Sequence, residues 1–147
     1  MEEKKDISQI QNRIVREFSV LNDWTEKYEY LIKLGRKLPA MAEEHKSEEN
    51  LVRGCQSQVW LHAEEDGDRI QFEADSDAMI VKGLAALLLR VYSGQTPDAI
   101  LSNPPDFIND IGMENHLSPT RSNGLASMCK QIQYYAMAFK EKHSQEA

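Results

Sequence analysis

The sequence predicts an α+β domain in which a small antiparallel β-sheet is covered by helices. In the segments on either side of the middle of the chain, apolar residues recur every third or fourth position, which is the period of an amphipathic helix. Between them, residues 59–74 alternate apolar and polar side chains around an Asp-Gly pair, the pattern of a β-hairpin. Helices before and after one hairpin favour an α+β architecture.

The composition is that of a globular chain with the length of one domain. Of the 147 residues, 41% are hydrophobic and 28% are charged, which is typical of folded soluble domains. We therefore expect a single domain over residues 1–147, with a core from about residue 7 to residue 142.

Charge and hydropathy exclude two classes of partner. The net charge is −7 and no cluster of Lys and Arg stands out, which argues against nucleic acid because phosphate binding needs a basic surface. The longest apolar run, Leu84 to Leu89, is too short to span a membrane. The charged start of the chain is not followed by the apolar stretch of a signal peptide, so we expect a cytoplasmic protein.

The first two predicted helices form a helical hairpin. Asp6 is expected to cap the first helix, whose apolar stripe consists of Ile7, Ile10, Ile14, Phe18 and Leu21. Asp23 and Glu26 form a capping-box pattern at the start of the second helix. Gly35 lies near the end of that helix, at a position suited to a C-cap, and Leu38-Pro39 ends it.

The predicted β-hairpin follows a polar connection. Residues 41–50 carry two acidic pairs and are expected to form a solvated segment with about one helical turn. Residues 59–63 and 70–74 then alternate around a turn at Asp66-Gly67. Leu51-Val52 is a candidate for a short third strand.

The segment after the hairpin is predicted to be the buried central helix. Residues 78–92 are apolar on nearly every side, which is typical of a helix enclosed by other elements. Ser76 or Asp77 is expected to cap its start, and Gly94 to close its end in a left-handed conformation.

Further helices are expected in the C-terminal third. Thr96-Pro97 begins a short one, with threonine as cap and proline at the first helical position. Residues 116–124 are predicted to form a polar loop before a last helix, which begins near Leu125 and carries Cys129 on its apolar stripe. We therefore assign Cys129 to the core, and expect a loose tail after Lys142.

The most informative stretch surrounds one of the two cysteines. Cys55 directly follows Gly54, where the chain can bend sharply and another surface can approach the backbone. Gln56 and Ser57 make a poor core, which favours a thiol near the surface. Such a thiol is a nucleophile if its surroundings stabilise the thiolate; a buried, inert cysteine is the alternative that the residues alone leave open.

The residue types present disfavour several kinds of functional site and allow others. No glycine pattern of a phosphate-binding loop occurs, and the cysteines and histidines are not paired at zinc-ligand spacing, so no metal site is predicted. A cysteine hydrolase would use Cys55 with His116 or His62 as base. Two cysteines are too few for an iron–sulfur cluster in a monomer. One accessible thiol suffices to receive a sulfur atom as a persulfide and hand it on.

Four separated motifs resemble the SufE family of cysteine-desulfuration proteins, and the resemblance runs from about Ile7 to Phe139. The motifs are Gly54-Cys55-Gln56-Ser57-Gln58-Val59-Trp60; Asp75-Ser76-Asp77-Ala78 followed by Ile80-Val81-Lys82-Gly83-Leu84; His116-Leu117-Ser118-Pro119-Thr120-Arg121-Ser122-Asn123-Gly124-Leu125; and, near the N-terminus, Asn22-Asp23-Trp24 with Lys27-Tyr28 and Leu34-Gly35 with Leu38-Pro39.

The resemblance implies a fold like that of IscU-type scaffold proteins and a role as a sulfur carrier. It implies that Cys55 accepts sulfur from a PLP-dependent cysteine desulfurase of the SufS type, stimulates its turnover and passes the sulfur to an iron–sulfur scaffold. The PLP belongs to the desulfurase, so this chain needs no cofactor and is not itself an enzyme in the strict sense. A homodimer is compatible with the sequence.

The resemblance also implies roles for residues around Cys55. Gly54, Gln56 and Ser57 belong to its loop, and Arg121 would place positive charge near the thiolate or contact the partner. Asp75 would help to dock the partner or cap the central helix.

Alternatives remain for several of these residues and for the function as a whole. Without the resemblance, Arg121 is a surface residue at a helix entry. Cys129 is an extra thiol that the family pattern does not require. A cysteine-nucleophile hydrolase or small-molecule sulfurtransferase that pairs Cys55 with a histidine is the alternative function, and a non-catalytic assembly module is a third.

Overall fold

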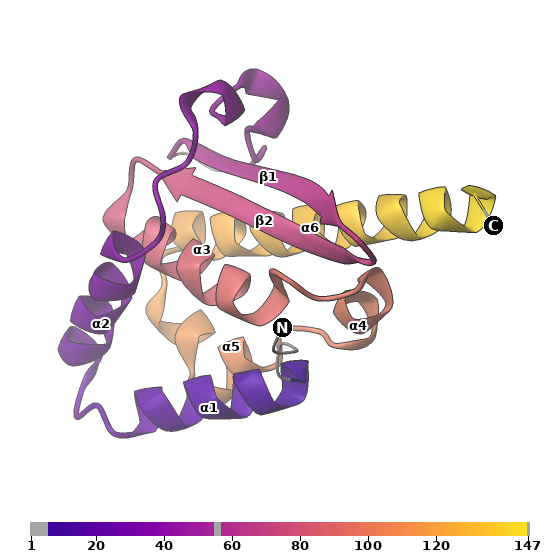
Figure 1. Cartoon of the computed structure of the whole chain (residues 1–147). Helices are drawn as coiled ribbons and strands as arrows, with labels where there is room; N and C mark the ends of the chain where they lie inside the picture. Colours follow the sequence, from indigo (N-terminus) through magenta and orange to yellow (C-terminus); the bar gives the residue numbers. More distant parts are fainter. Residues whose placement is uncertain (1–5, 55–56, 147) are drawn as a thin grey trace.

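The computed structural model describes residues 6–54 and 57–146, with side chains up to residue 143, and confirms the predicted α+β class (Figure 1). In order along the chain, the elements are α1 (Ile7–Ser19), α2 (Trp24–Arg36), the 3₁₀ turns η1 (Glu43–His45) and η2 (Glu48–Asn50), β1 (Val59–Asp66), β2 (Arg69–Ser76), α3 (Met79–Tyr92), α4 (Pro97–Ser102), α5 (Phe107–Asp110), η3 (Met113–His116) and α6 (Pro119–Glu146).

The β-hairpin forms where the sequence predicts it. β1 and β2 pair antiparallel from Val59 opposite Ser76 to Asp66 opposite Arg69, and Gly67 in the turn has a φ of +65°, a conformation that glycine adopts without steric cost. Apolar residues of both strands point to the core and polar residues to the other face. The predicted third strand is reduced to a single bridge between Leu51 and Trp60.

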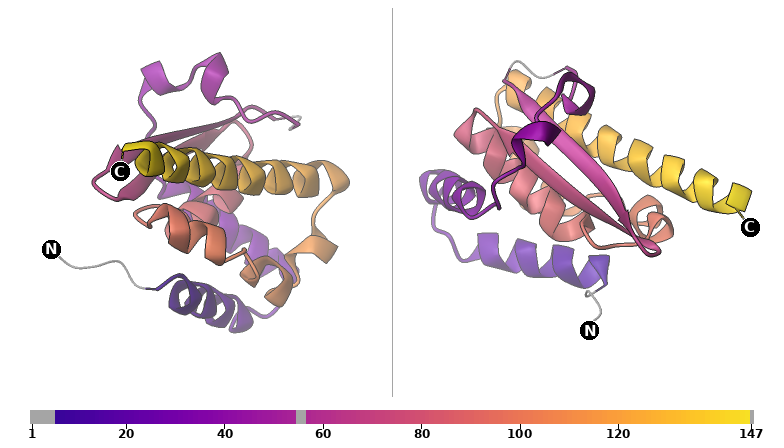
Figure 2. Two further views of the ribbon diagram at one scale, coloured as in Figure 1. Left: turned by 90° about the vertical axis from the view of Figure 1, so that its right-hand side faces the viewer. Right: turned by 45° about the horizontal axis from the view of Figure 1, so that its top comes forward.

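The helices lie in layers against one face of this sheet, whereas η1 and η2 lie on the other side (Figures 1 and 2). α3 is the central element and contacts β2, α1, α2 and α6. Most of its side chains are buried, as the sequence predicted. Met79, in the first turn of α3, was expected to be enclosed but is 58% exposed.

The N-terminal caps follow the sequence closely. The Asp6 carboxylate accepts the Ser8 N–H, the Asp23 carboxylate accepts the Glu26 N–H, and the Thr96 hydroxyl accepts the Ala99 N–H. Each bond satisfies a donor that the first helical turn leaves unpaired.

Three helix boundaries differ from the prediction. α6 begins at Pro119, six residues before Leu125, and continues to Glu146, past the expected loose tail. α3 begins at Met79, and its N-cap residue Ala78 receives no side-chain cap, so the prediction that Ser76 or Asp77 caps the helix was wrong. Among the helices in the described part of the chain, none combines the length and apolar character needed to cross a lipid bilayer.

α2 and α3 approach each other so closely that two glycines are required where they meet. A Cβ built on Gly83 would lie 2.3 Å from the Leu31 carbonyl oxygen, and one on Gly35 would lie 2.9 Å from the Gly83 nitrogen. Both clashes are with backbone atoms, which cannot rotate away. The expected C-cap role of Gly35 was therefore wrong: Lys37 holds the C-cap position in a right-handed conformation, and Gly35 is needed for helix packing.

We predict that Gly83→Ala destabilises the fold by about 1–3 kcal/mol, the usual cost of overpacking a core. In a helix interior, alanine is normally more favourable than glycine by about 1 kcal/mol. Any net loss of stability in the variant therefore reports the clash with α2. Urea unfolding measures the change. Glu29→Ala, on the exposed side of α2, is the control and should stay within about 0.5 kcal/mol of the parent; equal stability of Gly83→Ala and the parent would contradict the packing argument.

Candidate functional site

Gly54 and Ser57 lie on either side of the segment that carries Cys55. Cys55 and Gln56 lie outside the described residues, so the site is built from their neighbours. Gly54 has a φ of +89°, and a Cβ at this position would lie 2.9 Å from the Ser127 Oγ on α6. The structure thus confirms both expectations for Gly54: a backbone conformation that favours glycine, and close approach by another surface.

The chain after Cys55 is anchored to the corner between β2 and α3. The Gln58 N–H donates to the Asp77 carboxylate at 3.1 Å, and the Gln58 carbonyl accepts from the Ser76 hydroxyl at 2.8 Å and from the Asp77 N–H at 3.2 Å. The Ser76 hydroxyl also accepts the Ala78 N–H at 3.2 Å. Ser76 and Asp77 therefore hold Gln58 in place and do not cap α3.

A cleft opens beside Ser57, and we call it the Ser57 cleft. Its volume is about 420 Å³. It is formed by Ser57, the start of α3, and the residues that begin α6; the lining residues are Ser57, Ala78, Val81, Ser118, Thr120, Arg121 and Gly124.

The Ser57 cleft has a positive electrostatic character. The first turns of α3 and α6 both contribute to its wall, and a helix N-terminus carries partial positive charge and N–H donors. Arg121 adds a full charge from the first turn of α6, where its N–H donates to the Ser118 Oγ at 3.3 Å. Helix N-termini and neighbouring cations lower the pKa of cysteine thiols, so this cleft favours an anionic sulfur.

Comparison with known protein families agrees with the motifs that meet around this cleft. The model of the SufE family, described as an Fe-S metabolism associated domain, matches residues 12–136. The chain belongs to the SufE family. Membership indicates a role in iron–sulfur metabolism.

Relatives agree over most of the chain. An uncharacterized SufE-like protein of Rhizobium etli is 44% identical over 126 residues, covering 82% of this chain and 85% of the relative. One of Synechocystis is 41% identical over 127 residues, covering 86% and 80%. The solution structure of a hypothetical protein from Thermus thermophilus matches with a TM-score of 0.73 and 24% identity, over 88% of this chain and 94% of the other. This last similarity supports the SufE-like fold only.

Asp75 of this SufE-family chain is held by two lysines. Its carboxylate lies 3.0 Å from Lys46 Nζ and 3.3 Å from Lys82 Nζ, and it accepts the Ser76 N–H. Burial alone would raise the pKa of Asp75, but the hydrogen bonds from Lys46, from the Ser76 backbone and from Lys82 lower it below its ordinary value. Asp75 does not cap α3, which corrects that prediction, and it is not among the residues that line the Ser57 cleft.

Cys129 differs sharply from a reactive thiol. It packs against the core on α6, as the sequence predicted, and is partly buried. Burial raises its pKa to about 12, so it is almost entirely protonated at neutral pH and is a poor nucleophile.

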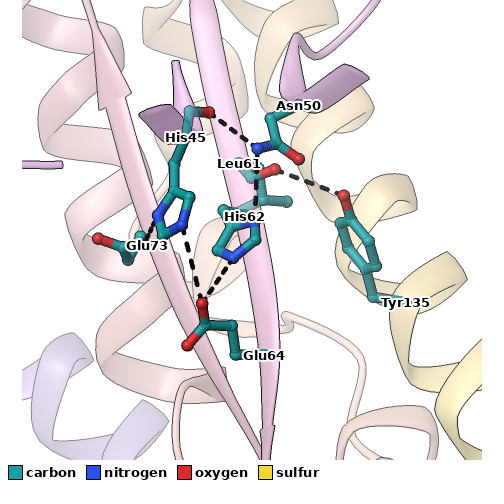
Figure 3. A network of polar contacts seen from close by, with 7 residues as sticks. All are labelled: His45, Asn50, Leu61, His62, Glu64, Glu73 and Tyr135. Atoms are coloured by element: carbon teal, nitrogen blue, oxygen red, sulfur yellow. Dashed lines mark hydrogen bonds and ion pairs between the residues drawn. The ribbon is translucent and has the colours of Figure 1, made fainter. Parts of the chain in front are cut away.

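The two histidines considered as catalytic bases lie elsewhere. The His116 ring stacks on Trp24, with ring centroids 3.9 Å apart. His62 projects from β1 into a group with His45 and two glutamates (Figure 3). Among the described residues that line the Ser57 cleft there is no histidine. The approach of His45 to His62 was missed because residues 41–50 have no pattern that places them in the fold.

We predict that Asp75→Asn destabilises the fold by about 1–3 kcal/mol at pH 7, because a largely buried carboxylate loses its ionic hydrogen bonds. The pKa of Asp75 is lower in the folded state, so its contribution is fully present above the ordinary value of about 3.9 and disappears as the pH falls through the lowered one. Urea unfolding at a series of pH values should show the difference from the parent shrinking in acid.

The control for this experiment is Asp98→Asn. Asp98 pairs with Lys140 but is 74% exposed, and such pairs contribute about 0–1 kcal/mol. The Asp75→Asn variant could lose no more unfolding free energy than Asp98→Asn does, or its loss could stay the same at every pH. Either result would show that the ion pairs of Asp75 do not stabilise the fold.

Proposed function

We propose that this chain is a sulfur carrier in iron–sulfur cluster assembly and that Cys55 is the acceptor thiol. The donor would be the persulfide of a PLP-dependent cysteine desulfurase of the SufS type. The observation that most supports this is the Ser57 cleft, where the first turns of two helices and Arg121 meet beside the segment that carries Cys55.

The proposed transfer is a thiol–persulfide exchange. The Cys55 thiolate attacks the terminal sulfur of the donor persulfide and forms a new S–S bond. The old S–S bond breaks, its electron pair goes to the donor cysteine, and that cysteine leaves as a thiolate. The terminal sulfur keeps its proton, Cys55 becomes a persulfide, and no outside oxidant or reductant is needed.

The residues around the Ser57 cleft would assist this exchange through charge and position. The attacking thiolate is an anion, and the persulfide becomes one when its terminal sulfur later releases its proton, so the helix N-termini and Arg121 would stabilise both. Gly54 lets the chain turn against α6, and the bonds of Ser76 and Asp77 to Gln58 fix the other end of the segment. Gln56 would belong to the contact with the desulfurase, although it lies outside the described residues.

The division of labour follows from this chemistry. The desulfurase holds PLP and breaks the C–S bond of cysteine, whereas this chain removes the sulfur and so allows faster turnover. It then hands the sulfur to an iron–sulfur scaffold. We expect the relay to operate in the cytoplasm, where thiols stay reduced.

The hydrolase alternative lacks support at the cleft. A cysteine hydrolase needs a base within hydrogen-bond reach of the nucleophile, and His62 and His116 are engaged in other contacts. We therefore propose the carrier function alone.

We predict that the purified chain accelerates alanine formation by a SufS-type desulfurase supplied with L-cysteine. Cys55→Ser should abolish the acceleration. Arg121→Ala should weaken it about tenfold, as expected for the loss of one ionic interaction of ~1.4 kcal/mol.

Two variants serve as controls in this assay. Cys129→Ser removes the other thiol, and Lys130→Ala removes a different exposed cation of α6; both should accelerate the desulfurase as well as the parent does. Full acceleration by Cys55→Ser would refute the proposal, and equal losses in Arg121→Ala and Lys130→Ala would refute a specific role of Arg121.

A further inference from the structure

The outer face of the β-hairpin carries a second group of reactive side chains (Figure 3), and none of them lines the Ser57 cleft. His62 on β1 lies directly opposite Glu73 on β2. Glu64 lies two residues beyond His62, so its side chain shares that face of the sheet. His45 reaches over the same face from η1. We call these four residues the histidine–glutamate cluster.

The four side chains converge over short distances. His45 Nδ1 lies 2.5 Å from the Glu73 Oε1, and His62 Nε2 lies 3.0 Å from the Glu64 Oε1. His45 Nε2 lies 3.8 Å from that same Glu64 oxygen. One ligand atom from each of His45, His62 and Glu73 falls within 4.8 Å of the others.

The imidazoles of the cluster share one small volume with the carboxylates. The rings of His45 and His62 are nearly parallel, with centroids 3.8 Å apart. The Glu73 carboxylate lies against the first ring and the Glu64 carboxylate against the second. Such a donor set suits a divalent cation, which takes imidazole nitrogens and carboxylate oxygens together.

We propose that His45, His62 and Glu73 bind a zinc ion, with Glu64 as the fourth ligand. Imidazole and carboxylate are common zinc ligands, whereas magnesium and calcium prefer oxygen alone. Tetrahedral bonds of about 2.0–2.2 Å would place the ligand atoms about 3.4 Å apart. The ligand atoms of His45, His62 and Glu73 now lie within 4.8 Å of one another, so these side chains must draw together to bind the ion. Glu64 is sufficiently exposed to rotate toward them.

A neighbouring amide supports both histidines. The Asn50 side-chain N–H donates to the His45 carbonyl at 2.8 Å and also lies 3.3 Å from His62 Nδ1. Contacts of this kind orient metal ligands and restrict the ring positions they can adopt.

The proposed ion would join three segments of the chain. It would tie η1 to β1 and β2, and η1 is followed by the residues that lead to Gly54. Val52 on that path donates its N–H to the Val59 carbonyl at 2.8 Å. The ion would therefore be structural and would restrain the chain that leads into the Cys55 segment. The cluster shares no residue with the lining of the Ser57 cleft, so the zinc site does not depend on the proposed sulfur transfer.

Calorimetric titration with zinc chloride tests this site. The full chain should carry Cys55→Ser, because a reactive thiolate would itself bind zinc. We expect one equivalent to bind, with at least about tenfold weaker binding after His45→Gln or His62→Gln. His143→Gln, which removes a histidine outside the cluster, should bind as the parent does.

Two further readouts separate loss of a ligand from loss of the fold. Zinc at a hundredfold excess over its dissociation constant should raise the melting temperature by about 5–10 °C in the parent, but not in His62→Gln. Cobalt should give the visible spectrum of a tetrahedral ion in the parent and in His143→Gln, and Glu73→Gln should alter it. No binding by the Cys55→Ser chain, or equal binding by the parent and both cluster variants, would overturn the proposal.

Discussion

The close contact between α2 and α3 is the constraint on which the rest of the structure depends. Gly83 and Gly35 meet with no room for a side chain on either, so the two helices are held close together. This contact fixes α3 under the sheet, and the first turn of α3 forms one wall of the Ser57 cleft. The other walls come from the chain around Ser57 and from residues 118–124. Three of the four motifs that resemble the SufE family are therefore far apart in the sequence but meet at this cleft.

Local patterns predicted the parts of the fold that local physics determines. The caps at Asp6, Asp23 and Thr96 and the position of the hairpin could be derived from the sequence, because each depends on residues only a few positions apart. The start of α6 was predicted too late, since residues 120–124 lack an apolar stripe where they face the cleft. The Ser118-Pro119 pair, a cap followed by proline at the first helical position, was the available signal.

Contacts between distant residues could not be predicted in this way. Asp75 was expected to cap α3 because it precedes that helix, but Lys46 and Lys82 reach its carboxylate instead. Lys46 comes from a connecting segment whose path has no signature in the sequence. The same holds for His45, so the histidine–glutamate cluster became visible only in the fold, where His62 lies opposite Glu73.

Cys55 and Cys129 provide an internal comparison for the central claim that Cys55 receives sulfur. The most direct test is peptide-level mass spectrometry after the chain has been incubated with a SufS-type desulfurase and L-cysteine. We predict a gain of one sulfur atom, about 32 Da, on the Cys55 peptide and no gain on the Cys129 peptide. Sulfur on Cys129 instead, or on neither cysteine, would contradict the carrier function assigned to Cys55.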